Sequence, residues 1–280
     1  MINGTTLIQR FERFASPQLA EKWDHVGLQV GDPDQPLLRL MTSLDVRPET
    51  VAEAIDQQVD FIFAHHPVMF HPAQNLDTRN PQNQMYADLL AHHITVYAAH
   101  TNLDTANGGM NDWLAAKLGL TNCQPLVPAG TDPITGAPVG MGRIGNFNGQ
   151  MTPREFADYC RRLFGVAGLR LINHPDDGQK EIHRVAVLGG AGQDFYADAV
   201  RMGADAYVTG DVSYHFAHDM LANHLTVVDP GHHIEAICEH QLAELFRSWQ
   251  AENDGWDFEI VENQLNTDPF TFVVDGKENQ

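Results

Sequence analysis

Residues 61–70 of the chain read Phe-Ile-Phe-Ala-His-His-Pro-Val-Met-Phe, a short apolar run followed by two histidines and a proline. The run at 61–64 is continuous and rich in aromatic residues, which predicts a short buried strand. Pro67 stops the strand, so the backbone turns near His65 and His66, and both imidazoles can face one crevice. Two adjacent histidines are more often simple hydrogen-bonded turn residues, so this pair alone does not establish a functional site.

Length and composition limit the class of protein. The chain has 280 residues, enough for two ordinary domains, and 43% of them are hydrophobic, enough for a packed core. A net charge of −20 disfavours direct binding of nucleic acid. The three cysteines are far apart and odd in number, which is typical of free thiols in a reducing compartment. The chain start does not resemble a signal peptide and no stretch reaches membrane-spanning length, so we predict a cytoplasmic protein without a membrane segment.

Strand-like and helix-like segments alternate along the chain, which predicts the α/β fold class with mainly parallel sheets covered by helices. The predicted strands include residues 37–44, 61–64, 95–99, 185–188, 206–209 and 225–228. The predicted helices include residues 5–14, 48–58, 83–93, 152–164 and 194–202. Residues 121–150 are rich in proline and glycine, so a domain boundary is expected near residue 125, with one short β segment around 139–147.

Polar side chains follow several predicted strands at the point where each strand ends. They are His65 and His66, Asp104, Asp211 with His215, and His232 with Glu235. Ligands of open α/β sheets bind beyond the carboxyl ends of the strands. Imidazole and carboxylate groups bind zinc, iron, manganese or nickel. Each cluster alone would more often be a capped helix or a polar turn, but their common placement favours a metal site.

The number of candidate ligands favours two ions. His65, His66, Asp104, His232 and Glu235 are too many for one catalytic zinc, which usually has three protein ligands and an open position. They suit two divalent metal ions if one carboxylate bridges, an arrangement that can clamp a phosphate or carbonyl oxygen. Since His232 and Glu235 must then meet His65 and His66, the final helix should return to the first domain. We therefore predict a discontinuous metal-binding domain of residues 1–125 plus 226–280, an inserted α/β domain of residues 126–225, and a metal site in the interdomain cleft.

Several motifs, in order along nearly the whole chain, resemble the dinuclear metal-centre protein family, also called YbgI-like or Nif-three-like. They are Ser43-Leu44-Asp45, Ala64-His65-His66-Pro67, residues 97–104, residues 108–114, Thr209-Gly210-Asp211 with His215, and Asp229-Pro230-Gly231-His232. The resemblance implies a two-domain α/β fold, a toroidal homohexamer built as a trimer of dimers, and a site in which two transition-metal ions use the five ligands above. Family members place the last carboxylate three or four residues after the histidine; here position 236 is Ala, so Glu235 must serve. His233 is an alternative ligand, and His25 stands where the family more often has Asn.

The bacterial members are often named GTP cyclohydrolase I type 2 homologs, which implies a nucleotide-like substrate and hydrolytic opening of the purine ring of GTP. His215 or Asp211 would move protons in such a reaction, and the less favoured alternative for His215 is a helix-surface residue. A metal-dependent phosphoesterase would use the same residues, and a non-enzymatic regulatory or adaptor hexamer that binds metal is a third possibility. Arginines near the site, such as Arg143 or Arg170, would favour a triphosphate substrate.

Overall fold

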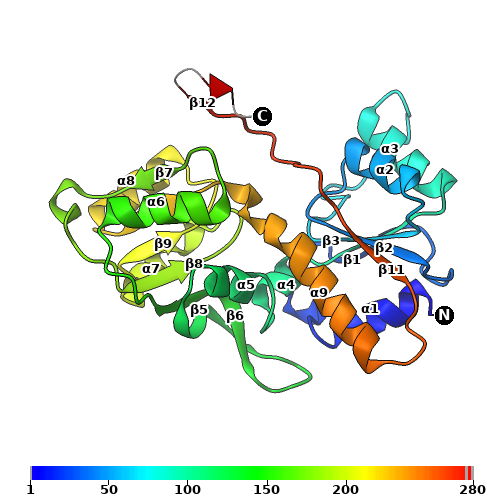
Figure 1. Ribbon diagram of the computed structural model, residues 1–280, viewed down its shortest axis with the longest axis horizontal. Coiled ribbons are helices and arrows are strands. Elements are labelled where there is room, and N and C mark those ends of the chain that lie inside the picture. Colours follow the sequence, from blue (N-terminus) through cyan, green and yellow to red (C-terminus); the bar gives the residue numbers. More distant parts are fainter. Residues whose placement is uncertain (1, 275–276, 279–280) are drawn as a thin grey trace. The chain divides into compact units, whose positions relative to one another are not determined.

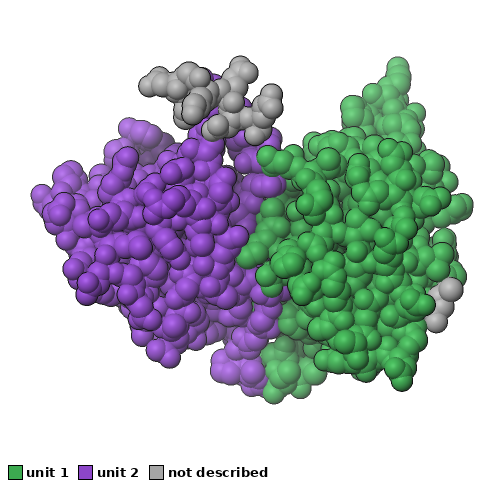
Figure 2. All heavy atoms as spheres, viewed as in Figure 1, with its two compact units in different colours: residues 1–106, 132–135, 236–267 green, residues 107–131, 136–235, 268–280 purple. Residues whose placement is uncertain are grey.

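The computed structural model describes residues 2–274 and 277–278 of the chain. This part of the chain is an α/β protein that divides into two compact units, each coloured separately in Figure 2. Unit 1 comprises Met1–Ala106, Asp132–Thr135 and Ala236–Thr267, and unit 2 comprises Asn107–Thr131, Gly136–Glu235 and Asp268–Gln280.

Unit 1 is built on a five-stranded mixed sheet with the strand order β1-β4-β3-β2-β11. The strands β2, β3 and β4 are parallel, β11 is parallel to β2, and β1 is antiparallel to β4. The strands are β1 (Gly27–Val30), β2 (Arg39–Ser43), β3 (Phe61–Ala64), β4 (Thr95–Ala98) and β11 (Glu259–Glu262). The helices are α1 (Gly4–Glu12), η1 (Pro17–Leu19), α2 (Pro48–Asp56), α3 (Pro81–Ala91), α4 (Thr101–Thr105) and α9 (Ile237–Glu252).

Helices cover both faces of this sheet, so β3 is buried along its whole length, as its apolar run predicts. Figure 1 shows α2 and α3 on one face and α1 with α9 on the other. Successive strand residues point to opposite faces, so Ile62 packs in the cluster under α2 and α3 while the Phe63 ring lies 4.5 Å from Phe11 and 5.0 Å from Phe246. Each such aromatic ring stabilises the fold by about 1.5–3 kcal/mol on burial. Because Phe246 belongs to α9, this helix near the end of the chain packs in the same unit as α1 and β3.

Unit 2 is built on a six-stranded mixed sheet with the strand order β5-β6-β8-β9-β10-β7. Only β8, β9 and β10 are parallel to one another; the other three pairings are antiparallel. The strands are β5 (Thr121–Thr131), β6 (Pro138–Asn146), β7 (Arg170–Ile172), β8 (Arg184–Val187), β9 (Ala206–Val208) and β10 (Thr226–Asp229). The helices are α5 (Met110–Lys117), α6 (Pro153–Phe164), η2 (Pro175–Asp177), η3 (Gln193–Phe195), α7 (Tyr196–Arg201), α8 (Tyr214–Ala222) and η4 (His232–Ala236). A two-stranded sheet of β12 (Val273–Val274) and β13 (Lys277–Glu278) lies near the end of the chain.

Two features of unit 2 differ from the sequence prediction. The sheet is mixed rather than mainly parallel, because β5 and β6 form a hairpin and β7 adds to the edge in the antiparallel sense. The strand β5 was not predicted, since Pro125 and Pro128 interrupt its pattern. Proline is tolerated there because β5 is an edge strand, where a backbone N–H can be missing without loss of a ladder bond.

The segment before α9 also differs from the predicted domain boundaries. β10 was assigned to the metal-binding domain of residues 226–280, but it pairs in parallel with β9 inside the sheet of unit 2. All four residues of β10 are buried in that sheet, so of the segment 226–280 only Ala236–Thr267 belongs to unit 1. Among the residues that the structure describes, no helix is both long and apolar enough to span a bilayer.

Candidate metal centre

Three histidines of unit 1 converge at the carboxyl ends of two neighbouring parallel strands. His65 and His66 follow β3, and His100 follows β4. The ring centroids lie 5.0 Å apart for His65 and His66, 5.2 Å for His65 and His100, and 5.5 Å for His66 and His100. One nitrogen of each ring lies within 4.8 Å of the others, so the three imidazoles could hold a metal ion. His100 was not among the predicted ligands, although its place after β4 matches that of His65 after β3.

Hydrogen bonds hold Nδ1 of His65 and of His66, and Nδ1 of His100 lies at ion-pair distance from a carboxylate. His65 Nδ1 lies 2.8 Å from the carbonyl oxygen of Ala99, and His66 Nδ1 lies 2.8 Å from Asp45 Oδ1. His100 Nδ1 lies 3.1 Å from Asp24 Oδ2. A proton on each Nδ1 leaves the Nε2 lone pair for a metal, which is the usual arrangement of histidine ligands and their outer hydrogen-bond partners.

The predicted ligand Asp104 lies beside His65 in the same unit. Its Oδ1 is 3.6 Å from His65 Nε2. Two ligand atoms that each lie about 2 Å from a tetrahedral ion are roughly 3.3 Å apart. The buried carboxylate and the imidazole therefore have nearly the spacing of two ligands of one ion.

Asp24 carries a fixed negative charge behind His100. Burial raises the pKa of its carboxyl group, but hydrogen bonds with His100 and Thr101 outweigh burial and lower the pKa to about 2. The backbone N–H of Thr101 donates to Asp24 Oδ2 over 3.0 Å. Asp24 is thus ionised at neutral pH and favours a proton on His100 Nδ1.

Unit 2 carries the other two predicted ligands at the carboxyl end of β10. His232 Nε2 lies 3.1 Å from Glu235 Oε2, as their spacing of three residues predicts. His232 Nδ1 lies 2.8 Å from Oδ2 of Asp211, which follows β9. His232 therefore has the same ring arrangement as the histidines of unit 1. The alternative ligand His233 lies in the same short helix, η4.

The Glu235 carboxylate occupies space that two glycines leave open. A Cβ atom at Gly189 would lie 2.6 Å from Glu235 Oε1, and one at Gly190 would lie 2.9 Å from the same oxygen. Both glycines follow β8, the strand next to β9. The absence of side chains at these two glycines therefore makes room for a predicted ligand.

The residues predicted to act in catalysis and the predicted arginines occupy different environments. Asp211 contacts His232, as described above, and His215 lies exposed on α8 with its ring 5.5 Å from that of Tyr214. Arg143 is buried and both of its contacts to the Asp112 carboxylate are 2.7 Å. Arg170 forms an ion pair with Asp229. Both arginines are thus engaged within unit 2, so neither supports a triphosphate site.

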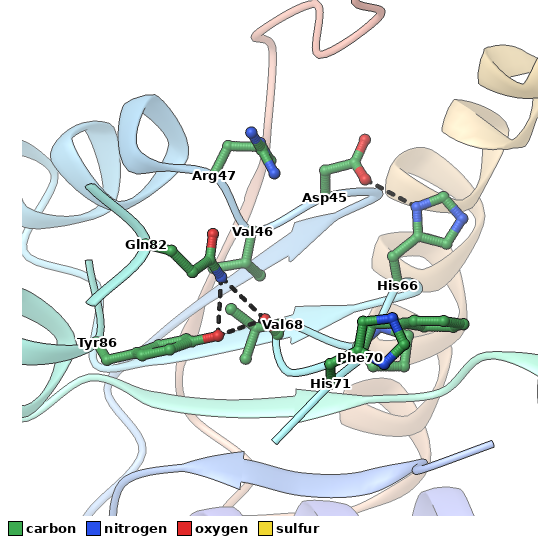
Figure 3. Close-up of a pocket in the computed structure, with 10 residues that line it drawn as sticks. Asp45, Val46, Arg47, His66, Val68, Phe70, His71, Gln82 and Tyr86 are labelled. Carbon is green, nitrogen blue, oxygen red and sulfur yellow. Dashed lines mark hydrogen bonds and ion pairs between the residues drawn. The ribbon is translucent and has the colours of Figure 1, made fainter. Parts of the chain in front are cut away.

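A cavity of about 320 Å³ opens beside His66 within unit 1. Figure 3 shows its walls, which include Asp45, Arg47, His66, His71, Gln82 and Tyr86. Gln82 Nε2 donates to the carbonyl oxygen of Val68 over 3.1 Å and to the Tyr86 hydroxyl over 2.9 Å, which fixes one wall. Arg47 is exposed, and within the described part of the chain its guanidinium has no hydrogen-bond or ion-pair partner. A cation is therefore available beside the histidine cluster.

The fold and these groups define an α/β protein with two mixed sheets and buried histidine–carboxylate clusters that could hold metal ions. The chain belongs to the Duf34/NIF3 (NGG1p interacting factor 3) family, whose model matches residues 2–269. The resemblance found in the sequence is thus confirmed.

Individual relatives cover almost the whole chain. The chain is 43% identical over 271 residues to a GTP cyclohydrolase 1 type 2 homolog of Streptococcus pneumoniae, covering 96% of this chain and 99% of that protein. The structure of a Bacillus cereus protein related to NIF3 matches with a TM-score of 0.91 and 28% identity over 98% of this chain and 99% of that one. The structure of the protein ybgI, described as of unknown function, matches with a TM-score of 0.74 and 25% identity over 93% and 98% of the two chains.

Proposed function

We propose that this protein is a dinuclear metal-dependent hydrolase. In this proposal His65, His66 and Asp104 from unit 1 act with His232 and Glu235 from unit 2 on two divalent transition-metal ions, and Glu235 is the bridging ligand. The main support is that Nδ1 of each predicted histidine ligand lies 2.8 Å from a carboxylate or carbonyl oxygen of its own unit. This pattern leaves every Nε2 for a metal, and the mixed nitrogen and oxygen donors suit zinc, iron, manganese or nickel.

The chemistry divides between the ions and the chain. When bound, such ions lower the pKa of water and polarise a carbonyl or phosphoryl oxygen. Asp45 and Asp211 orient His66 and His232. Arg47 is suited to a phosphate group in the cavity beside His66, because a guanidinium pairs with two phosphate oxygens at once.

The substrate we favour is a purine nucleotide, whose ring the enzyme would open by hydrolysis. This choice rests on the name of the relative, a GTP cyclohydrolase 1 type 2 homolog. Arg47 also favours a second candidate, hydrolysis of a phosphoester. His215 and Asp211 remain our proposed proton-transfer residues. The expected result for His215→Ala is full metal content with turnover reduced roughly a hundredfold.

The test combines metal analysis with turnover. Anaerobically purified wild-type protein should contain about two ions per chain, and Glu235→Ala should fall toward one or none, because a bridging ligand contributes to both ions. Assays on GTP, other nucleotides and simple phosphoesters then separate the two hydrolase candidates. Full metal content in Glu235→Ala would show that the Glu235 carboxylate does not bridge the two ions. Absence of turnover with both ions present would favour a non-enzymatic regulatory ring that binds metal. Analytical sedimentation would then test whether this ring is the proposed hexamer.

A further inference from the structure

A second histidine–carboxylate cluster lies in unit 2, formed by His174, Asp177 and His224. One donor atom from each of these residues lies within 4.8 Å of the others. The two imidazole rings have centroids 4.2 Å apart, and His224 Nδ1 lies 2.8 Å from Asp177 Oδ2. Two imidazoles and a carboxylate are the kind and number of protein ligands that an ion with one open, water-filled position uses.

This cluster lies at the opposite end of β10 from His232. His224 precedes β10, whereas His232 follows it. β7 runs antiparallel to β10, with Ile172 opposite Val227, so His174 also lies at the start of β10. The four residues of β10 alone place roughly 13 Å between the two ends. The cluster is therefore separate from the ligands proposed above.

We propose that His174, Asp177 and His224 form a third metal site, for an ion that favours imidazole, such as Zn²⁺ or Ni²⁺. The ligands come from two segments, the chain after the edge strand β7 and the turn before β10. A bound ion would tie the edge strand to the interior of the sheet. The backbone N–H of Asp176 donates to His174 Nδ1 over 3.3 Å, a long hydrogen bond that metal binding through Nε2 would give up.

Another cluster shows what makes this one suitable. His240, Glu244 and Glu262 of unit 1 also have three donor atoms within 4.8 Å. There, however, Arg247 Nη1 lies 2.6 Å from Glu244 Oε1 and 2.7 Å from Glu262 Oε1. A guanidinium thus already neutralises that cluster, whereas no arginine or lysine side chain forms an ion pair or hydrogen bond with His174, Asp177 or His224 among the described residues.

The test uses the full-length protein and asparagine substitutions chosen to preserve the backbone. His224 has a φ of 55°, a left-handed conformation that asparagine adopts readily, and His174 caps η2, a role that asparagine also performs. The variants are His174→Asn and His224→Asn. The matched control is His183→Asn, which replaces an exposed histidine of the same unit whose ion pair is with Glu181. Zinc per chain is measured by elemental analysis after equilibrium dialysis, together with the rise in melting temperature on addition of zinc.

We expect wild-type protein and His183→Asn to bind one more zinc ion per chain than His174→Asn or His224→Asn. The part of the zinc-dependent rise in melting temperature that this ion causes should disappear in the same two variants. In His65→Ala the third ion should remain, so failure of this site and failure of the proposed active centre are distinguishable. Zinc contents equal to that of His183→Asn in both variants would overturn the proposal. A second measurement leaves the proposed site itself unchanged. Co²⁺ added to His65→Ala should shift the ring-proton resonances of His174 and His224, and unshifted resonances would also overturn the proposal.

Discussion

The two units carry their predicted ligands at equivalent places in their sheets but in unequal surroundings. In unit 1 the His65 side chain is 0% exposed, and three imidazoles pack against one another beyond β3 and β4. In unit 2 the His232 side chain is 36% exposed and its ring contacts Asp211 and Glu235, while Glu235 is 3% exposed. The ligands of unit 1 are thus ordered by packing before any ion binds, which reduces the ordering cost of binding. We therefore expect metal binding to be more sensitive to changes in unit 1.

The largest effect is expected for His65→Ala. This change removes a buried ligand whose Nδ1 is already fixed by the Ala99 carbonyl oxygen. Metal affinity, measured by competition with a chromophoric chelator, should fall by a hundredfold or more, and any turnover should fall with it. The control is His92→Ala, an exposed histidine at the end of α3. If His65→Ala bound metal with wild-type affinity, His65 of unit 1 would not be a metal ligand.

The outer carboxylates give a direct comparison of the two units. Asp45→Asn and Asp211→Asn each keep the size of the side chain but remove the charge beside His66 or His232. We expect a loss of metal affinity of roughly ten- to a hundredfold for Asp45→Asn. The loss for Asp211→Asn should be smaller, because the His232–Asp211 pair is 36% and 46% exposed and solvent screens it. Equal losses would show that burial does not distinguish the two ligand sets.

Gly189→Ala tests the buried carboxylate of unit 2. The new Cβ atom would lie 2.6 Å from Glu235 Oε1, so the carboxylate must move. We expect a stability loss of about 1–3 kcal/mol from overpacking and a loss of metal affinity of about tenfold. Gly178→Ala is the control, since its nearest neighbour, a carbonyl oxygen, would lie 3.5 Å away. Unchanged affinity in Gly189→Ala would mean that Glu235 needs no fixed position.

The sequence predicted the elements whose hydrophobic pattern is local. β3 is an uninterrupted apolar run, and the helix predicted over residues 152–164 is confirmed as α6. The edge strand β5 was missed because its prolines remove the local signal, and its pairing with β6 depends on residues further along the chain.

The candidate site shows the same limit. The five predicted ligands stand next to strand ends in the sequence, and this placement identified them. His100 and the outer carboxylates Asp45 and Asp24 were not assigned, because they approach the ligands only through strand register and loop packing. Asp45, for example, reaches His66 from the neighbouring strand, 21 residues earlier in the chain.

The smallest effect concerns the stability of unit 1 and not its metal content. Glu239 lies on α9, where burial raises the pKa of its carboxyl group from an ordinary value of 4.5 to about 7. The hydrogen bond from the Leu44 N–H opposes this rise, and the charges of Asp45 and Glu262 add to it. Between these two pH values the folded protein holds a proton that the unfolded chain has released, so stability falls as the pH rises from about 4.5 to about 7.

Glu239→Gln keeps an acceptor for Leu44 but does not titrate. Relative to wild type, it should therefore be nearly neutral at pH ~4.5 and stabilising by roughly 1–2 kcal/mol at pH ~8, after allowance for partial exposure. Thermal unfolding of both proteins across this range measures the difference, with the exposed Glu244→Gln of the same helix as the control. A constant difference between Glu239→Gln and wild type at all pH values would show that Glu239 does not titrate in this window.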